Sequence, residues 1–159
     1  MPTRSGHSAV ILVVDDDEGD RELTRRAFAR SKIHNDLYCV DDAEQALDYL
    51  KRQGTYSDPA LSPRPDLVLL DLNMPRRDGR YVLEEMRKDE SLRHIPVVVM
   101  TISDQETDIV RSSGLVANAC VVKPVDISQF ARVIATLQHY WLEVVVLPRT
   151  GFERDADTP

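Results

Sequence analysis

Short apolar runs alternate with amphipathic stretches along most of this chain. The runs are continuous enough to predict strands buried on both faces, at residues 9–14, 37–40, 66–70, 95–100 and 119–122. Between and after them, apolar side chains recur at helical spacing. This pattern predicts helices within residues 21–30, 41–54, 81–88, 104–113 and 126–142.

The second helix carries the clearest end signals. Asp41 or Asp42 is its expected N-cap, because Glu44 or Gln45 follows three positions later in a capping-box pattern. Gly54 is its expected end. The proline-rich stretch that follows predicts a loop.

Strands that alternate with helices indicate an α/β fold, a doubly wound five-stranded parallel sheet with helices on both faces. Right-handed crossovers favour the strand order 2-1-3-4-5. In that order the chain reverses direction between the first and third strands. A ligand crevice is therefore expected at the carboxyl ends of these two strands.

Carboxylates stand at both of these strand ends. Asp15 and Asp16 follow the first strand and Asp71 follows the third, so the three should converge, whereas Asp17 reads equally well as a helix cap. Two like charges about 4 Å apart repel by about 4 kcal/mol at an effective dielectric near 20. Protonation or a bound cation relieves that repulsion. Mg²⁺ suits the site, because it needs only one or two carboxylates besides waters and phosphate oxygens.

Two more strand ends add a hydroxyl and an ammonium group. Thr101 follows the fourth strand and Lys123 follows the fifth. Alone, the first is more often a helix cap and the second a solvated surface charge. Together with the acids, they form a pocket in which Asp71 can act as nucleophile toward a phosphoryl donor.

These motifs, in sequence order, resemble those of the response-regulator receiver family over roughly residues 9–142: Asp15-Asp16, Asp71-Leu72-Asn73-Met74-Pro75, Asp78-Gly79, Thr101 and Lys123-Pro124. The resemblance implies a flavodoxin-like receiver fold and a signalling switch rather than an enzyme. It makes Asp71 the phosphoacceptor. It also implies that Mg²⁺ is held by Asp15, Asp16 and Asp71 and by the backbone carbonyl of Asn73.

The resemblance also assigns the groups that bind and sense the phosphoryl group. It gives that role to Thr101 and Lys123, and it implies a cis bond before Pro124. Receivers usually carry Tyr or Phe three residues before the lysine, where this chain has Cys120. The usual aromatic switch is therefore excluded, and Ile102, in place of a small residue, is expected to narrow access to the pocket.

Composition limits the partners and the compartment. The net charge of −7 argues against nucleic-acid binding. No apolar stretch is long enough to span a bilayer or resembles a signal segment, which predicts a soluble cytoplasmic protein. Cys39 and Cys120 lie in apolar runs on strands expected at opposite sheet edges, which predicts two buried thiols and no disulfide.

The chain ends extend beyond the predicted domain. Residues 1–8 and 149–159 are expected to be disordered. Between them and the last helix, residues 143–148 form an apolar arm for which the domain offers no core. Such an arm usually marks a partner surface, and a two-fold homodimer is the simplest way to bury it. The expected dimer contacts are Trp141, Val144, Val145, Val146 and Leu147.

The long loop at residues 54–65 and the C-terminal residues 139–148 resemble single-domain regulators paired with phytochrome kinases. That resemblance implies a phytochrome-like sensor histidine kinase as phosphoryl donor. A phosphotransfer protein or an effector is expected downstream, reached by protein–protein contact.

Three other interpretations are open at this point. A haloacid-dehalogenase-type phosphatase also uses aspartates after its first strand, but it leaves the segment around Asp71 unexplained. A flavodoxin-like FMN binder needs a loop of Gly, Ser and Thr after the first strand, where this chain carries acids that repel phosphate. A degenerate receiver that only binds partners is a minor alternative, because the acceptor set is complete.

Overall fold

The computed structural model describes residues 8–31, 34–74, 78–112, 114, 117, 119–123 and 126–137. The strands in this part are β1 (Ala9–Val14), β2 (Asn35–Val40), β3 (Leu67–Asp71), β4 (Val97–Thr101) and β5 (Ala119–Val122). The α-helices are α1 (Glu18–Ala29), α2 (Ala43–Lys51), α3 (Gly79–Lys88), α4 (Asp104–Ser112) and α5 (Ile127–Leu137). Two short 3₁₀ helices, η1 (Gly54–Tyr56) and η2 (Pro59–Leu61), occupy the predicted loop.

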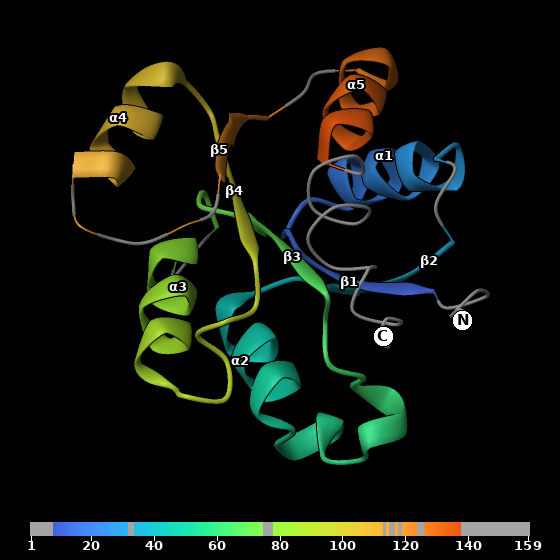
Figure 1. Cartoon of the computed structure of the whole chain (residues 1–159), viewed down its shortest axis with the longest axis vertical. Helices are drawn as coiled ribbons and strands as arrows, with labels where there is room; N and C mark the ends of the chain where they lie inside the picture. The colour runs from blue at the N-terminus through green and yellow to red at the C-terminus, as the bar shows by residue number, and fades with distance from the viewer. Residues whose placement is uncertain are drawn as a thin grey trace, which may run out of the picture.

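The strands form one parallel sheet in the order β2-β1-β3-β4-β5. Figure 1 shows helices on both sides of it, with α1 and α5 over one face and α2 and α3 over the other. This arrangement confirms the predicted α/β fold and strand order. It also places the carboxyl ends of β1 and β3 side by side, where the crevice was expected.

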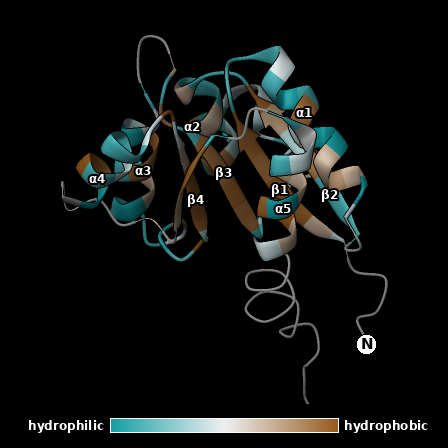
Figure 2. Ribbon diagram, turned by 90° about the horizontal axis from the view of Figure 1, so that it is seen from above, coloured by the Kyte–Doolittle hydropathy of each residue, from teal (hydrophilic) through white to brown (hydrophobic). Residues whose placement is uncertain are grey.

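Each face of the sheet has its own apolar core, and alternate residues of one strand serve both. Ile11 and Val13 of β1 pack with Phe28 of α1 in the cluster under α1 and α5. Leu12 and Val14 point the other way, into the cluster under α2 and α3. Figure 2 shows the central strands as the most hydrophobic part of the molecule. Burial on both faces explains why the strands read as continuous apolar runs.

Helix α1 begins earlier than its apolar spacing predicted, at Glu18 rather than near residue 21. Asp17 is its N-cap, because Oδ2 accepts a hydrogen bond from the backbone N–H of Asp20 at 2.8 Å. The first turn is polar, so hydrophobic periodicity could not reveal it.

Helix α2 starts as predicted but ends sooner. Asp42, one of the two expected caps, accepts a hydrogen bond from the backbone N–H of Gln45 at 2.7 Å. The helix stops before Arg52, which adopts the left-handed conformation with φ 54°. The prediction that Gly54 ends the helix is therefore wrong, because an arginine takes the position that glycine usually fills.

The two cysteines lie on opposite edges of the sheet, Cys39 in β2 and Cys120 in β5. Both are free thiols and both are half-buried. Their places at opposite edges of the sheet put a disulfide out of reach, as predicted. The prediction that both thiols are buried is wrong, because edge strands cover them only in part.

None of the helices described above combines the length and apolar character needed to cross a membrane. Several predictions concern residues outside the described part of the chain, and they stay predictions. These are the cis bond at Pro124, the dimer contacts at Trp141 and Val144–Leu147, and the state of residues 1–7 and 149–159.

Candidate functional site

Three carboxylates meet at the carboxyl ends of β1 and β3. One oxygen from each of Asp15, Asp16 and Asp71 lies within 4.8 Å of the other two. Asp15 and Asp71 are buried, whereas Asp16 is exposed. The cluster is therefore rooted in the core and open to solvent on one side.

Backbone and side-chain contacts fix the orientation of Asp15. Its N–H donates to the carbonyl of Val40 at 3.1 Å, which continues the pairing of β1 with β2. Its own carbonyl accepts from Nη1 of Arg21 at 2.8 Å, and its Oδ1 accepts from the N–H of Asp17 at 2.9 Å. These bonds leave Oδ2 as the oxygen that faces the site.

Asp71 closes β3 where α3 comes into direct contact with the strand. Its Oδ1 accepts from the N–H of Asn73 at 2.9 Å. A Cβ added at Gly79 would lie 2.5 Å from the carbonyl oxygen of Asp71, so only glycine fits there. Asp78 caps α3 one residue earlier. The Asp78-Gly79 pair thus sets how closely α3 approaches the acidic site.

One ammonium group faces the buried acids. Nζ of Lys123 lies 3.1 Å from Oδ2 of Asp15 and donates to Oδ2 of Asp71 at 3.0 Å. Its shortest contact, at 2.7 Å, is with Oδ2 of Asp20 in the first turn of α1. The N–H of Lys123 donates to the carbonyl of Thr101 at 2.7 Å, which anchors its backbone beside β4.

Sequence reasoning did not single out Asp20. The available signal was an acid in the first turn of the helix that follows the Asp15-Asp16 strand end. That turn was placed outside the predicted helix, so the signal was not used.

Burial and neighbouring charges affect the ionisation of Asp15 and Lys123 differently. Burial raises the pKa of Asp15 to about 6, although the N–H of Asp17 and the charge of Lys123 act to lower it. Burial lowers the pKa of Lys123, but its hydrogen bond to Asp20 and the nearby carboxylates outweigh this and raise it. Lys123 therefore stays protonated, while Asp15 carries its charge at a free-energy cost.

The donor set fits a divalent cation. Oδ2 of Asp15 is fully buried, and among the described residues its one close polar contact is the ion pair with Nζ of Lys123 at 3.1 Å. Most buried polar atoms have a hydrogen-bond partner, so we expect Oδ2 of Asp15 to have a further partner such as a metal ion. Hard cations prefer carboxylate oxygens, and one oxygen each of Asp16 and Asp71 lies within 4.8 Å of an oxygen of Asp15.

Thr101 contacts α4, the residue before it and the β5 carbonyl of Val121 at 3.4 Å, rather than the acids. Its hydroxyl donates to the carbonyl of Ser103 at 3.2 Å and shares a hydrogen bond with Oγ1 of Thr107 at 2.9 Å. Both threonines are buried. A movement of the Thr101 hydroxyl toward Asp71 would therefore break a buried bond to α4.

The first turn of α4 also contacts the loops that follow β3 and β4. Oε1 of Glu106 accepts from Nδ2 of Asn73 at 2.9 Å and from the N–H of Ile102 at 3.0 Å. The Ile102 side chain is 65% exposed, so its effect on access stays a prediction. The sequence did not single out Glu106 and Thr107, because polar residues on a helix are common and the residues that they contact are known only from the structure.

Cys120 occupies the strand position where receivers usually carry an aromatic ring. It pairs with Val99 in the register of β4 and β5 and packs at the edge of the core cluster under α2 and α3. Burial raises the pKa of the thiol. Cys120 is therefore a small, protonated packing residue.

Comparison with known proteins gives consistent matches. The model of the response regulator receiver domain matches residues 11–135. Response regulator Rcp1 of Synechocystis sp. is 37% identical over 148 residues, which cover 93% of this chain and 99% of that protein.

Solved structures agree with the sequence matches. The phosphorylated cyanobacterial phytochrome response regulator RcpA is 37% identical with a TM-score of 0.78, covering 89% of this chain and 99% of that one. The Mn²⁺-bound form of Rcp1 is 38% identical with a TM-score of 0.75, covering 88% of this chain and 99% of that one. These matches do not favour the phosphatase or flavin-binding alternatives.

Proposed function

This chain belongs to the family of response regulator receiver domains, and from that membership we propose that a phosphoryl group on Asp71 switches it. Receivers are signalling proteins, so the product of the reaction is a changed conformation rather than a released molecule. The observation that carries the proposal is the setting of Asp71. It is a buried carboxylate at the end of β3, with Asp15 and Asp16 within 4.8 Å and Nζ of Lys123 at 3.0 Å.

The transfer is a nucleophilic substitution at phosphorus. A carboxylate oxygen of Asp71 forms a bond to phosphorus while the bond to a histidine nitrogen of the donor breaks. The electron pair of that bond stays on the imidazole, which then takes up a proton from solvent. Lys123 stabilises the negative charge on the phosphoryl oxygens, because its ammonium group already lies beside Oδ2 of Asp71.

Mg²⁺ is the metal that we assign to the acidic cluster. The side chains of Asp15, Asp16 and Asp71 would hold it together with the backbone carbonyl of Asn73. When bound, the ion supplies positive charge to the phosphoryl oxygens. Its positive charge would also offset the burial that raises the pKa of Asp15 and the smaller repulsion from Asp71.

The conformational signal would leave the site through α4. The Thr101 hydroxyl turns toward the phosphoryl group and gives up its 2.9 Å bond to Thr107. Loss of that bond loosens α4 from β4. This route needs no aromatic ring, which suits a chain with Cys120 at the usual aromatic position.

A sensor histidine kinase of the phytochrome type is the proposed donor, because RcpA, a phytochrome response regulator, is 37% identical to this chain. A phosphotransfer protein or an effector would receive the signal by direct contact, in the cytoplasm.

We also propose a homodimer joined through Trp141 and the arm at Val144, Val145, Val146 and Leu147. Full burial of one Val or Leu side chain is worth roughly 1.5–3 kcal/mol, so an arm of this composition favours a partner. Sedimentation of the full chain and of a truncation after Leu142 tests this. A dimer that becomes a monomer on truncation supports the proposal, and two monomers at micromolar concentration contradict it.

Labelling tests the phosphoacceptor. Asp71→Asn should reduce Mg²⁺-dependent incorporation of phosphate from labelled acetyl phosphate to background, because the nucleophile is gone. Asp108→Asn is the matched control, since it removes one exposed carboxylate from α4 and should label like the parent protein. Retained labelling of Asp71→Asn would contradict the assignment.

A further inference from the structure

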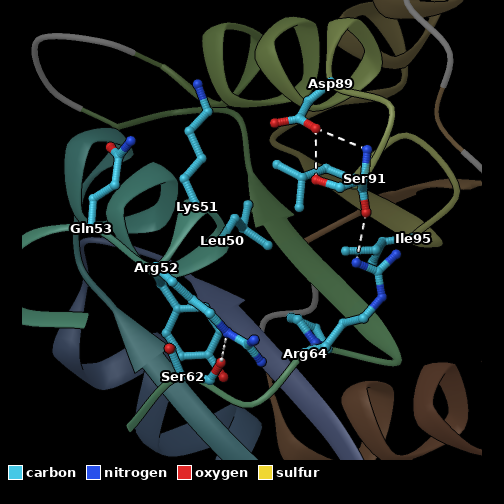
Figure 3. A pocket seen from close by; sticks show the side chains of 12 residues that line it. Leu50, Lys51, Arg52, Gln53, Ser62, Arg64, Asp89, Ser91 and Ile95 are labelled. Carbon is cyan, nitrogen blue, oxygen red and sulfur yellow. Dashed lines mark hydrogen bonds between the residues drawn. The ribbon is translucent and has the colours of Figure 1, made fainter. Parts of the chain in front are cut away.

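A pocket opens near the amino ends of β3 and β4, at the opposite end of the sheet from the acidic cluster. It lies between the end of α2, the loop that contains η1 and η2, and the connection from α3 to β4 (Figure 3). Its volume is about 470 Å³. Sites for small molecules usually measure roughly 300–1,000 Å³.

The charges that line this pocket oppose the charge of the whole chain. Arg52 and Arg64 contribute two positive charges, against one negative charge from Asp89. Lys51 also lines the pocket, but its ammonium group forms an ion pair with Glu85 at 3.7 Å. The chain as a whole carries −7. The pocket is therefore a local positive region on an acidic protein, and it favours anions.

Asp89, the one acid that lines the pocket, accepts hydrogen bonds within its own loop. Oδ1 of Asp89 accepts from the N–H of Ser91 at 2.9 Å and from its hydroxyl at 2.7 Å. These two bonds lower the pKa of Asp89. The carboxylate is thus held in the turn after α3, where Lys51 and Arg64 also act on its charge. Among the described residues, neither Arg52 nor Arg64 has an acid within salt-bridge distance.

Both arginines are held in place by carbonyl groups. Nε of Arg52 donates to the carbonyl of Ser62 at 3.1 Å, and Nη1 of Arg64 donates to the carbonyl of Ser91 at 2.6 Å (Figure 3). The other N–H groups of both guanidinium groups make no hydrogen bond within the described residues. A fixed guanidinium with free N–H groups is suited to bidentate contact with a phosphate or carboxylate.

The backbone conformation of Arg52 independently indicates that its side chain has a role in the pocket. Its φ of 54° and ψ of 55° lie in the left-handed region that side chains other than glycine rarely adopt. Glycine would end α2 there without strain, and Gly54 stands two residues away. An arginine kept in a disfavoured conformation suggests that its side chain is needed where it lies.

We propose that this pocket binds a small organic anion that carries phosphate or carboxylate groups. Arg52 and Arg64 supply the charged hydrogen bonds, whereas the charge of Lys51 is shared with Glu85. The proposal is independent of phosphorylation at Asp71, because the pocket and the acidic cluster occupy opposite ends of the sheet.

Titration of metal-free protein tests the proposal. Protein stripped on a chelating resin is titrated separately with inorganic phosphate, pyrophosphate and citrate, and backbone amide shifts are followed by ¹H–¹⁵N NMR. Without metal the acidic cluster repels anions, so signals of Asp71 and Thr101 should stay in place. We expect saturable shifts at Gln53, Ser62 and Ser91. Stronger binding of pyrophosphate indicates a phosphate ligand, and stronger binding of citrate indicates a carboxylate ligand.

Variants separate a ligand site from loops that the arginines merely hold together. Arg64→Gln and Arg52→Gly should each weaken binding roughly tenfold or more, because each removes a charge-assisted hydrogen bond. Arg52→Gly also removes the strained backbone, so the fold should be preserved. Arg93→Gln is the matched control, since Arg93 is exposed on the same connection and does not line the pocket. Absence of saturable shifts up to about 10 mM anion, or equal weakening by the control, would overturn the proposal.

Discussion

The two ends of the sheet carry opposite charges and hold them in different ways. At the carboxyl ends, Asp15 and Asp71 are buried around one ammonium group. At the other end, Arg52 and Arg64 lie at the surface and are fixed by backbone carbonyl groups. The acidic end therefore holds unfavourable charge in the core, as sites built for a reaction often do. The basic end has its charge solvated and available for contact.

These two kinds of site differ in whether the amino-acid sequence alone reveals them. Buried charge must follow the topology of the sheet, because only strand ends bring carboxylates into the core at one point. Surface charge obeys no such constraint. It can be recognised as a site only when its anchoring bonds are known.

The largest expected effect comes from a substitution that alters only the acidic end of the sheet. Asp15→Asn keeps the shape of the side chain and removes one metal-facing charge. It should weaken Mg²⁺ binding by at least about 100-fold, since unit charges about 4 Å apart interact by about 4 kcal/mol at an effective dielectric near 20. Isothermal titration calorimetry measures this. Arg64→Gln, at the other end of the sheet, should bind Mg²⁺ as the parent protein does.

The same variant also tests the free-energy cost of that buried charge. Burial raises the pKa of Asp15 to about 6. Metal-free Asp15→Asn should therefore equal or exceed the parent protein in free energy of unfolding, measured with urea. A loss above about 2 kcal/mol would mean that the carboxylate is mainly structural, because breaking a needed buried ion pair costs about 3–5 kcal/mol.

Close packing around Asp71 gives the next largest effect. Gly79→Ala places a Cβ 2.5 Å from the carbonyl oxygen of Asp71 and should lower the free energy of unfolding by about 1–3 kcal/mol. Gly19→Ala is the control, because its nearest neighbour is the Asp17 side chain at 3.3 Å. Thermal unfolding should separate the two variants, and equal stability would show that α3 does not need this approach.

A smaller effect tests the connection from the acidic end to α4. Thr107→Val removes the partner of the Thr101 hydroxyl, a bond worth about 1 kcal/mol, so the phosphorylation rate with acetyl phosphate should rise by up to about fivefold. Thr107→Ser should restore the parent rate because it restores the hydroxyl. Thr136→Val, the same change on α5, serves as control. A lower stability with an unchanged rate would limit Thr107 to a structural role.

The smallest effect concerns the backbone at the basic end. Arg52→Gly and Arg52→Ala both lose the bond to Ser62, but only glycine relieves the left-handed conformation. The glycine variant should be more stable than the alanine variant by about 1 kcal/mol. Urea unfolding measures the difference, and the reverse order would mean that Arg52 carries no strain.

The sequence was sufficient for the sheet and for the residues at its carboxyl ends. The run Ala9–Val14 forms β1 as predicted, and Asp71 lies at the carboxyl end of the third strand, as its last residue. The polar residues that bound each apolar run mark where the strands end, and the carboxyl ends of parallel strands meet at one edge of the sheet, which brings Asp15 and Asp71 together.

What the sequence could not give depends on particular partners. Asp20 contacts Lys123 because α1 starts at Glu18, which places Asp20 in its first turn. That turn is polar, so the spacing of apolar residues does not predict it. The bond from Thr101 to Thr107 and the conformation of Arg52 depend on helix positions that vary by one or two residues without changing the apolar pattern.

The most direct test of the central claim is to locate the phosphoryl group chemically. The protein is incubated with Mg²⁺ and acetyl phosphate, the acyl phosphate is reduced with borohydride, and the reduced residue is mapped by mass spectrometry of peptides. We expect reduction at Asp71 alone, and only when Mg²⁺ is present. Reduction at Asp15 or Asp16 would contradict the assignment of Asp71 as phosphoacceptor. So would the absence of any reduced residue in protein that has taken up phosphate.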